Sequence, residues 1–271
     1  MKKRLLQLVV VVFSMICIVG CSSTATTEKK ADDVEKEREV TLYIVRHGKT
    51  MLNTTDRVQG WSDAVLTPQG EKTVGYLGNG LKDIKFSAAY SSDSGRSMQT
   101  ANIILGENKK SDVSLQTDKR LREFNFGSYE GDLNRTMWAD IAERQGKTLD
   151  EWMDEGVSPK DFANSVAELD KDRVKEGKNW PAENYETITK RLKESIHEIA
   201  KKESKRGNGN VLVVSHGLSI GALVDTLFDG YELPAGGLKN ASVTTIKYKD
   251  GEYSLGKVGD LSYVEKGQKQ E

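Results

Sequence analysis

Two histidines close near-identical pieces of this sequence, Thr41–Gly48 (TLYIVRHG) and Asn210–Gly217 (NVLVVSHG). Each piece is a run of β-branched and aliphatic residues that ends in a polar residue, a histidine and a glycine. Such runs are typical of strands buried on both faces, as parallel strands in an α/β sheet are. In that architecture ligands bind beyond the carboxyl ends of the strands. We therefore expect His47 and His216 to lie on one rim of one sheet.

Helical and strand patterns alternate along the rest of the chain. Thr67 and Pro68 are typical of a helix start, and Asp250-Gly251 is typical of a hairpin turn. Ser92 or Asp93 is expected to cap a helix that follows a strand. The other expected elements are strands at 40–46, 86–91, 242–248 and 253–258 and a helix at 188–200. This alternation predicts an α/β fold with three αβα layers and a mostly parallel central sheet.

The pattern changes between about residues 125 and 185, where charges are frequent. Three of the four tryptophans, Trp138, Trp152 and Trp180, lie in this segment, and 137–144 and 148–155 look helical. We predict a helical cap insertion above the sheet that selects the substrate. Most of these tryptophans are expected to pack a small satellite core of the cap.

The amino terminus is typical of a targeting segment at residues 1–20. A basic start (Lys2, Lys3, Arg4) precedes a largely apolar stretch of fifteen residues, 5–19, shorter than the roughly 20 that a membrane-spanning helix needs. The residues ending at Cys21 resemble a bacterial lipoprotein signal. We therefore predict cleavage, a lipid on Cys21 and a membrane anchor on the extracytoplasmic face. An ordinary secretory signal and a short uncleaved anchor are the alternatives.

Composition indicates how the chain after the signal is organised and which partners it can have. Residues 21–39 are polar and are expected to form a flexible tether, 40–264 a single domain, and 265–271 a polar tail. The whole chain has 40 basic and 41 acidic residues, and a chain starting at Cys21 carries a net charge of −4. This balance argues against nucleic acid as a partner. The only other cysteine, Cys17, lies in the signal, so a mature chain has no disulfide and no cysteine nucleophile.

Four polar pieces could form one site for a phosphoryl group. Arg46 beside His47 can bind phosphate oxygens while the imidazole attacks phosphorus. Arg96 falls in the first turn of a helix, where its charge and the helix amino terminus both favour an anion. Glu123 supplies a carboxylate, and His216 a second imidazole.

Together these pieces resemble the histidine phosphatase family, the clan that includes the cofactor-dependent phosphoglycerate mutases. The resemblance spans roughly residues 40–248. It rests on RHGxT at 46–50 with Asn53, SSDxxRxxQTA at 91–101, LRE at 121–123, SHG at 215–217, and the loop pieces 59–63 and 66–70. Two departures are Lys49, where glutamate is commonest, and Ser94-Gly95 before the arginine. Neither removes a group with a chemical role.

The resemblance implies a role for each matching residue. His47 is the nucleophile that becomes a phosphohistidine, and Glu123 is the proton donor. The residues implied to line the phosphate and substrate pocket are Arg46, Asn53, Gln59, Gly60, Arg96 and His216. The family's chemistry requires no metal and no cofactor.

Some of these residues have a second interpretation. Glu123 could pair with Arg120 or Arg122 on the surface, and Asn53 could serve only as the cap of its local turn. Glu130 is a competing acid, although we expect it to be a structural partner. His197, in the middle of a helix, is expected to face solvent.

Three functions compete. The preferred one is a phosphatase that hydrolyses a small phosphorylated substrate outside the cytoplasmic membrane. The second is a phosphoglycerate mutase, but Trp138 and Trp152 are followed by acids rather than by the basic pair that grips a substrate carboxylate in those enzymes. The third is a non-catalytic surface lipoprotein, which the presence of all four site pieces disfavours. The sequence leaves the natural substrate and the oligomeric state open.

Overall fold

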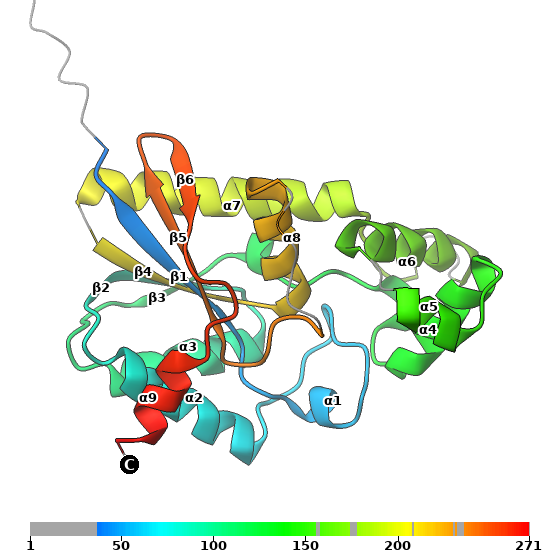
Figure 1. Ribbon diagram of the computed structural model, residues 1–271, viewed down its shortest axis with the longest axis horizontal. Helices are drawn as coiled ribbons and strands as arrows, with labels where there is room; N and C mark the ends of the chain where they lie inside the picture. The colour runs from blue at the N-terminus through cyan, green and yellow to red at the C-terminus, as the bar shows by residue number, and fades with distance from the viewer. Residues whose placement is uncertain are drawn as a thin grey trace, which may run out of the picture. The chain divides into compact units, whose positions relative to one another are not determined.

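The computed structural model describes residues 37–155, 158–173, 178–207, 209–229, 231 and 236–270. The expected signal peptide, the lipidation site Cys21 and most of the expected tether lie outside these residues. Within them, six strands form one sheet in the order β3-β2-β4-β1-β5-β6 (Figure 1). The strands are β1 (Val40–Arg46), β2 (Phe86–Ser91), β3 (Leu115–Thr117), β4 (Gly209–Ser215), β5 (Val243–Lys249) and β6 (Glu252–Leu255).

Helices cover both faces of this sheet. Those of the described residues are α1 (Met51–Thr54), α2 (Pro68–Leu81), α3 (Gly95–Glu107), α4 (Asn134–Arg144), α5 (Leu149–Glu155), α6 (Pro159–Arg173), α7 (Tyr185–Arg206), α8 (Gly217–Leu227) and α9 (Ser262–Gln268). In Figure 1, α2, α3 and α9 lie on one side of the sheet and α7 and α8 on the other. In the part of the chain that the structure describes, no helix is both long enough and apolar enough to cross a membrane.

The central strands are apolar throughout because both of their faces are covered. In β1, Leu42 and Ile44 belong to the core under α7 and α8, whereas Val45 belongs to the core under α2 and α3. In β4, Val213 likewise belongs to the core under α7 and α8, and Val214 to the core under α2 and α3. The pairings β3–β2, β2–β4 and β4–β1 are parallel, whereas the pairings β1–β5 and β5–β6 are antiparallel, so β5 is the strand that runs against the other five. The predicted three-layer, mostly parallel α/β fold is confirmed.

The register of the two central strands brings the histidines together. β1 and β4 are parallel neighbours in which Arg46 is the partner of Ser215. The next residue of each strand is a histidine, and the His47 N–H donates to the Ser215 carbonyl at 3.1 Å. His47 and His216 therefore leave the sheet side by side at its carboxyl rim, as expected.

The predicted helical cap is also present. Helices α4, α5 and α6 lie beyond one end of α7 (Figure 1). Trp152 is buried and Trp138 packs against the same apolar cluster, which continues into the sheet core rather than forming a separate satellite core. Trp180 differs, because its side chain is 62% exposed.

Two helix ends differ from the sequence expectation. Helix α3 begins at Gly95 with Ser94 as its N-cap residue and no side-chain cap, because Asp93 instead pairs with Arg122. Helix α9 crosses the boundary expected at residue 264, so the expected polar tail is largely helical. It packs on α2 through glycine: a β-carbon on Gly267 would lie 1.8 Å from a carbonyl oxygen of α2.

Candidate active site

His47 is buried at the end of β1, with 4% of its surface exposed. Its Nδ1 lies 2.8 Å from the carbonyl oxygen of Gly48. Because a carbonyl only accepts, Nδ1 carries the proton and Nε2 keeps its lone pair. Burial lowers the pKa of this imidazole well below its ordinary value, and the positive charges of Arg96 and Arg46 lower it further. The ring is therefore neutral, with an unprotonated nitrogen suited to nucleophilic attack.

His216 lies edge-on to His47, with ring centroids 5.2 Å apart. Its Nδ1 is 2.9 Å from Nη2 of Arg96 and its Nε2 is 2.8 Å from Oγ of Ser92. A guanidinium only donates, so Nδ1 accepts and Nε2 bears the proton. Burial, followed by the charge of Arg96, lowers the pKa of His216 well below its ordinary value. Both ring nitrogens are thus used to hold neighbouring groups.

The Arg96 side chain is fully buried at the start of α3. Its guanidinium donates to the carbonyl oxygens of Gly60 at 2.7 Å and Ser62 at 3.0 Å, and pairs with Asp63 at 2.8 Å. Asp63 also accepts from the Gly95 N–H. The loop that follows α1 therefore wraps around Arg96 and fixes its charge close to the histidine pair.

Arg46, the last residue of β1, donates through Nη1 to the carbonyl oxygen of Leu238. Burial lowers the pKa of Arg46, while the nearby Glu123 carboxylate opposes that effect. Gly217 makes room for the guanidinium, because a β-carbon there would lie 3.1 Å from Nε of Arg46. The glycine that follows His216 is thus explained by close packing against an arginine of the site.

Three buried nitrogens of this region lack a hydrogen-bond partner within the described part of the chain. They are Nε of Arg46, Nε of Arg96 and Nε2 of Gln59. Unpaired buried donors are rare, since each costs roughly 1–3 kcal/mol. Two of the three belong to the guanidinium groups themselves, and together with the Gln59 amide they form a set of donors suited to an anion such as phosphate.

Glu123 is 6% exposed and lies against the amino terminus of α8. Its Oε1 accepts from the Ser219 N–H at 2.8 Å and the Ser219 hydroxyl at 2.9 Å, and its Oε2 accepts from the Leu218 N–H at 3.0 Å. The alternative surface pairing is not observed, because Arg122 binds Asp93 instead. The carboxylate is thus held by Leu218 and Ser219, which follow His216 in the chain by two and three residues.

Glu130, the competing acid, has a different setting. Its carboxylate accepts from the backbone N–H groups of Gly60, Trp61, Ser62 and Phe126 at 2.7–3.1 Å. These bonds shape the loop that holds Arg96. Glu130 is accordingly a structural partner, as expected.

Asn53 and Gln59 belong to one hydrogen-bond network around α1. Asn53 closes a capping box with Thr50, and the Oε1 of Gln59 accepts from the Thr50 hydroxyl at 2.6 Å and the Asn53 amide at 3.4 Å. Asn53 therefore does cap its local turn, and its expected contact with substrate stays a prediction. Its Oδ1 also accepts from Asn240, whose amide reaches the His47 carbonyl at 3.0 Å, so the network is tied to the nucleophile's backbone.

Sequence reasoning missed Asn240 and Arg191. Arg191, on α7, donates to the carbonyl oxygens of Arg120, Arg122 and Glu123 at 2.7–2.8 Å and pairs with Glu183. No motif marks either residue, since their acceptors are mostly backbone carbonyls of segments distant in sequence. His197 lies outside this site and is exposed, as expected.

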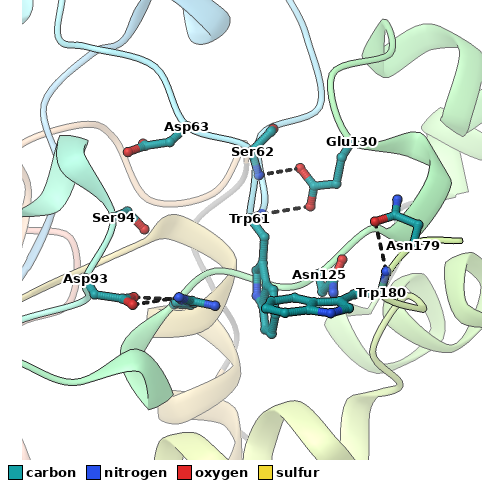
Figure 2. Close-up of a pocket in the computed structure, with 10 residues that line it drawn as sticks. Trp61, Ser62, Asp63, Asp93, Ser94, Asn125, Glu130, Asn179 and Trp180 are labelled. Carbon is teal, nitrogen blue, oxygen red and sulfur yellow. Dashed lines mark hydrogen bonds and ion pairs between the residues drawn. The ribbon is translucent and has the colours of Figure 1, made fainter. Parts of the chain in front are cut away.

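A pocket of about 440 Å³ lies between the loop that follows α1 and the segment that precedes α7 (Figure 2). It is lined by Trp61, Ser62, Asp63, Asp93, Ser94, Arg122, Asn125, Glu130, Asn179 and Trp180. Neither histidine is among these residues. The pocket is joined to the site through its walls, because Ser62 and Asp63 bind Arg96 and the Trp61 indole donates to the Glu123 carbonyl.

The sequence of this chain matches the model of a known protein family. The model of the histidine phosphatase superfamily, branch 1, matches residues 42–171 and 155–261, which include both histidines. The chain belongs to this superfamily, whose members include phosphoglycerate mutases and phosphatases that transfer or hydrolyse phosphoryl groups.

Individual relatives cover nearly the whole described domain. A probable phosphoglycerate mutase, GpmB, of Erwinia tasmaniensis is 28% identical over 83% of this chain and 94% of its own length. The crystal structure of a phosphoglycerate mutase from Bacillus anthracis is 41% identical, covers 86% of this chain and 99% of that one, and has a TM-score of 0.78. YhfR of Bacillus stearothermophilus is 26% identical over 83% and 99% of the two chains, with a TM-score of 0.63.

Proposed function

We propose that this protein is a phosphomonoester hydrolase that works through a phosphohistidine on His47. The observation that carries the proposal is the state of His47. Its ring is buried and neutral, and its tautomer is fixed by the Gly48 carbonyl. Three donors of the same region have no partner among the described residues. A weak nucleophile needs such activation, and the charge on a transferring phosphoryl group needs such donors.

In the first step, Nε2 of His47 attacks phosphorus and the bond from phosphorus to the ester oxygen breaks. Glu123 donates a proton to the departing oxygen, so the product leaves as a neutral alcohol. Arg46, Arg96 and Gln59 bind the non-bridging oxygens, and His216 holds Arg96 in place. Positioning and charge stabilisation supply most of the rate in phosphoryl transfer.

In the second step, water attacks the phosphohistidine. Glu123, now ionised, accepts a proton from this water, and the bond between phosphorus and nitrogen breaks. Inorganic phosphate leaves, and both His47 and Glu123 return to their starting states. The same carboxyl group thus serves as acid and then as base.

Mutase chemistry is the second candidate, because the relative from Bacillus anthracis is named a phosphoglycerate mutase. What supports hydrolysis instead is the charge of the pocket. Its lining holds three carboxylates, and its one cation among the described residues, Arg122, is already paired with Asp93. A substrate carboxylate would find no free positive charge in that lining.

Turnover of p-nitrophenyl phosphate by protein lacking residues 1–21 tests the hydrolase. We expect activity that survives EDTA and is lost in His47→Ala, with His197→Ala as a control that retains it. Full activity in His47→Ala would remove the nucleophile. Trapping of ³²P on the protein as an acid-labile phosphoramidate tests the intermediate, and isomerisation of 3-phosphoglycerate would favour the mutase. Absence of turnover with any phosphate ester would favour a binding lipoprotein.

We further propose that the enzyme acts at the extracytoplasmic face of the membrane, held by a lipid on Cys21. Support comes from the sequence alone: a basic start, a short apolar stretch and a cysteine after small residues. Metabolic labelling with radioactive palmitate, comparing the full chain with Cys21→Ala, tests this. Equal labelling of both chains, or none of either, would reject the anchor.

A further inference from the structure

The pocket shares part of its wall with the residues that hold Arg96 and the main chain of Glu123. Its wall includes Trp61, whose indole N–H donates to the Glu123 carbonyl at 3.0 Å. It also includes Ser62 and Asp63, which hold Arg96. A phosphate bound by Arg96 and protonated on its ester oxygen by Glu123 would thus have its alcohol portion next to this wall.

Two tryptophans from distant segments form one corner of the pocket (Figure 2). Trp61 follows α1, and Trp180 lies between α6 and α7. Their rings meet edge to face, with centroids 4.9 Å apart and planes at 86°. Trp180 is 62% exposed, so the core does not account for its position. Flat apolar faces of this kind bind rings at a small cost in conformational entropy.

Each charged group of the pocket lining already has a partner. Asp93 forms a two-pronged pair with Arg122, at 2.7 and 2.6 Å, and Arg122 in turn stacks on Trp61 at 4.7 Å. Asp63 is paired with Arg96, and Glu130 is saturated by backbone N–H groups. The lining residues that remain are the two indoles, two amides and two hydroxyls.

We infer that this pocket selects the leaving group, and that the corner of Trp61 and Trp180 favours an uncharged, hydroxylated ring. The inference rests on the proposed hydrolase and names its substrate class, the phosphate monoester of a cyclic sugar. The apolar C–H face of such a ring stacks on indole, and its hydroxyls bond to Asn125, Asn179 and the Asp93 carboxylate. A leaving group that carries a carboxylate is disfavoured because the three carboxylates of the lining outnumber its one guanidinium among the described residues.

Three primary-alcohol esters that differ only in the leaving group test the inference: glucose 6-phosphate, glycerol 3-phosphate and 3-phosphoglycerate. We expect kcat/KM for the ring ester to exceed that for the other two by about tenfold or more. Trp180→Ala should bring the ratio of ring to open-chain ester close to one, and Trp180→Phe should restore most of it. Met153→Ala, which truncates another exposed apolar side chain of the cap, should leave the ratio unchanged.

Binding without turnover gives a second readout. In His47→Ala, glucose 6-phosphate should change the tryptophan fluorescence, and this change should be lost in His47→Ala/Trp180→Ala. The inference would be overturned if all three esters were hydrolysed and the ratio of kcat/KM for ring and open-chain esters were the same in wild type and Trp180→Ala. A preference for 3-phosphoglycerate would overturn it as well. If no ester is hydrolysed, the hydrolase is rejected, and a fluorescence change that does not depend on Trp180 would then reject the ring subsite as well.

Discussion

The guanidinium of Arg191 donates a hydrogen bond of 2.8 Å to the backbone carbonyl of Glu123. The same group binds the carbonyls of Arg120 and Arg122, and Glu183 fixes it from the other side. Helix α7 therefore holds the main chain that carries the proposed proton donor. The position of that carboxyl group thus depends on a residue of α7 whose hydrogen bonds go to main-chain carbonyls and to Glu183.

Replacing Arg191 by lysine should lower kcat about tenfold while KM changes little, because an ammonium cannot span three carbonyls and a carboxylate at once. Steady-state kinetics with glycerol 3-phosphate measures this. Arg206→Lys is the matched control, since Arg206 is an exposed residue of the same helix that makes an ion pair within it. Equal effects of the two substitutions would contradict the positioning role.

Glu123→Gln should slow hydrolysis of alkyl phosphates by about 10²–10⁴-fold, because the alkoxide would leave without a proton. The loss should be smaller in the first step with p-nitrophenyl phosphate, whose leaving group is stable as an anion. Stopped-flow measurement should then show a burst of p-nitrophenol followed by slow turnover, because water attack still needs the base. Glu198→Gln, at an exposed carboxylate of α7, should behave as wild type.

The pH dependence of kcat/KM should reflect the low pKa of His47. Burial and two arginines lower this pKa, so the neutral nucleophile persists below about pH 6.5, where an ordinary imidazole becomes charged. After correction for ionisation of the substrate phosphate, whose second pKa is about 6, we expect kcat/KM to stay level through that value and to fall only at lower pH. A midpoint near 6.5 would contradict the assignment.

Circular dichroism must accompany that pH profile. Because the unfolded chain binds protons at its two buried histidines more readily than the folded chain does, the free energy of unfolding should decrease as the pH falls below about 6.5. The decline in kcat/KM counts as titration of His47 only where the fold is intact.

Gly217→Ala should lower kcat/KM without lowering stability. The added methyl would lie 3.1 Å from Nε of Arg46 and displace the guanidinium, whereas alanine favours the helical state by about 0.5–1 kcal/mol over glycine. Thermal unfolding and kinetics with p-nitrophenyl phosphate separate the two effects. Gly75→Ala, at a helical position with open space around the β-carbon, should gain the stability and keep the activity.

The sequence carried the information for the sheet and the two histidines because β1 and β4 are buried on both faces. Burial of that kind leaves an unbroken apolar run that local inspection detects. It did not carry the role of Arg191, whose acceptors are main-chain carbonyls of a loop placed by tertiary packing. Trp180 looked like the other cap tryptophans, since composition alone does not separate a buried indole from one at a pocket rim. Helix α9 was missed because its contact with α2 is made by glycine and backbone rather than by a stripe of apolar side chains.

The position of β1 and β4 in the middle of the sheet protects the two histidines against local unfolding. Interior strands of this kind open only when the whole domain opens. In urea, catalysis and far-ultraviolet ellipticity should therefore be lost in one common transition. Substitutions in the pocket formed with the cap, in contrast, should leave the register of the two imidazoles unchanged.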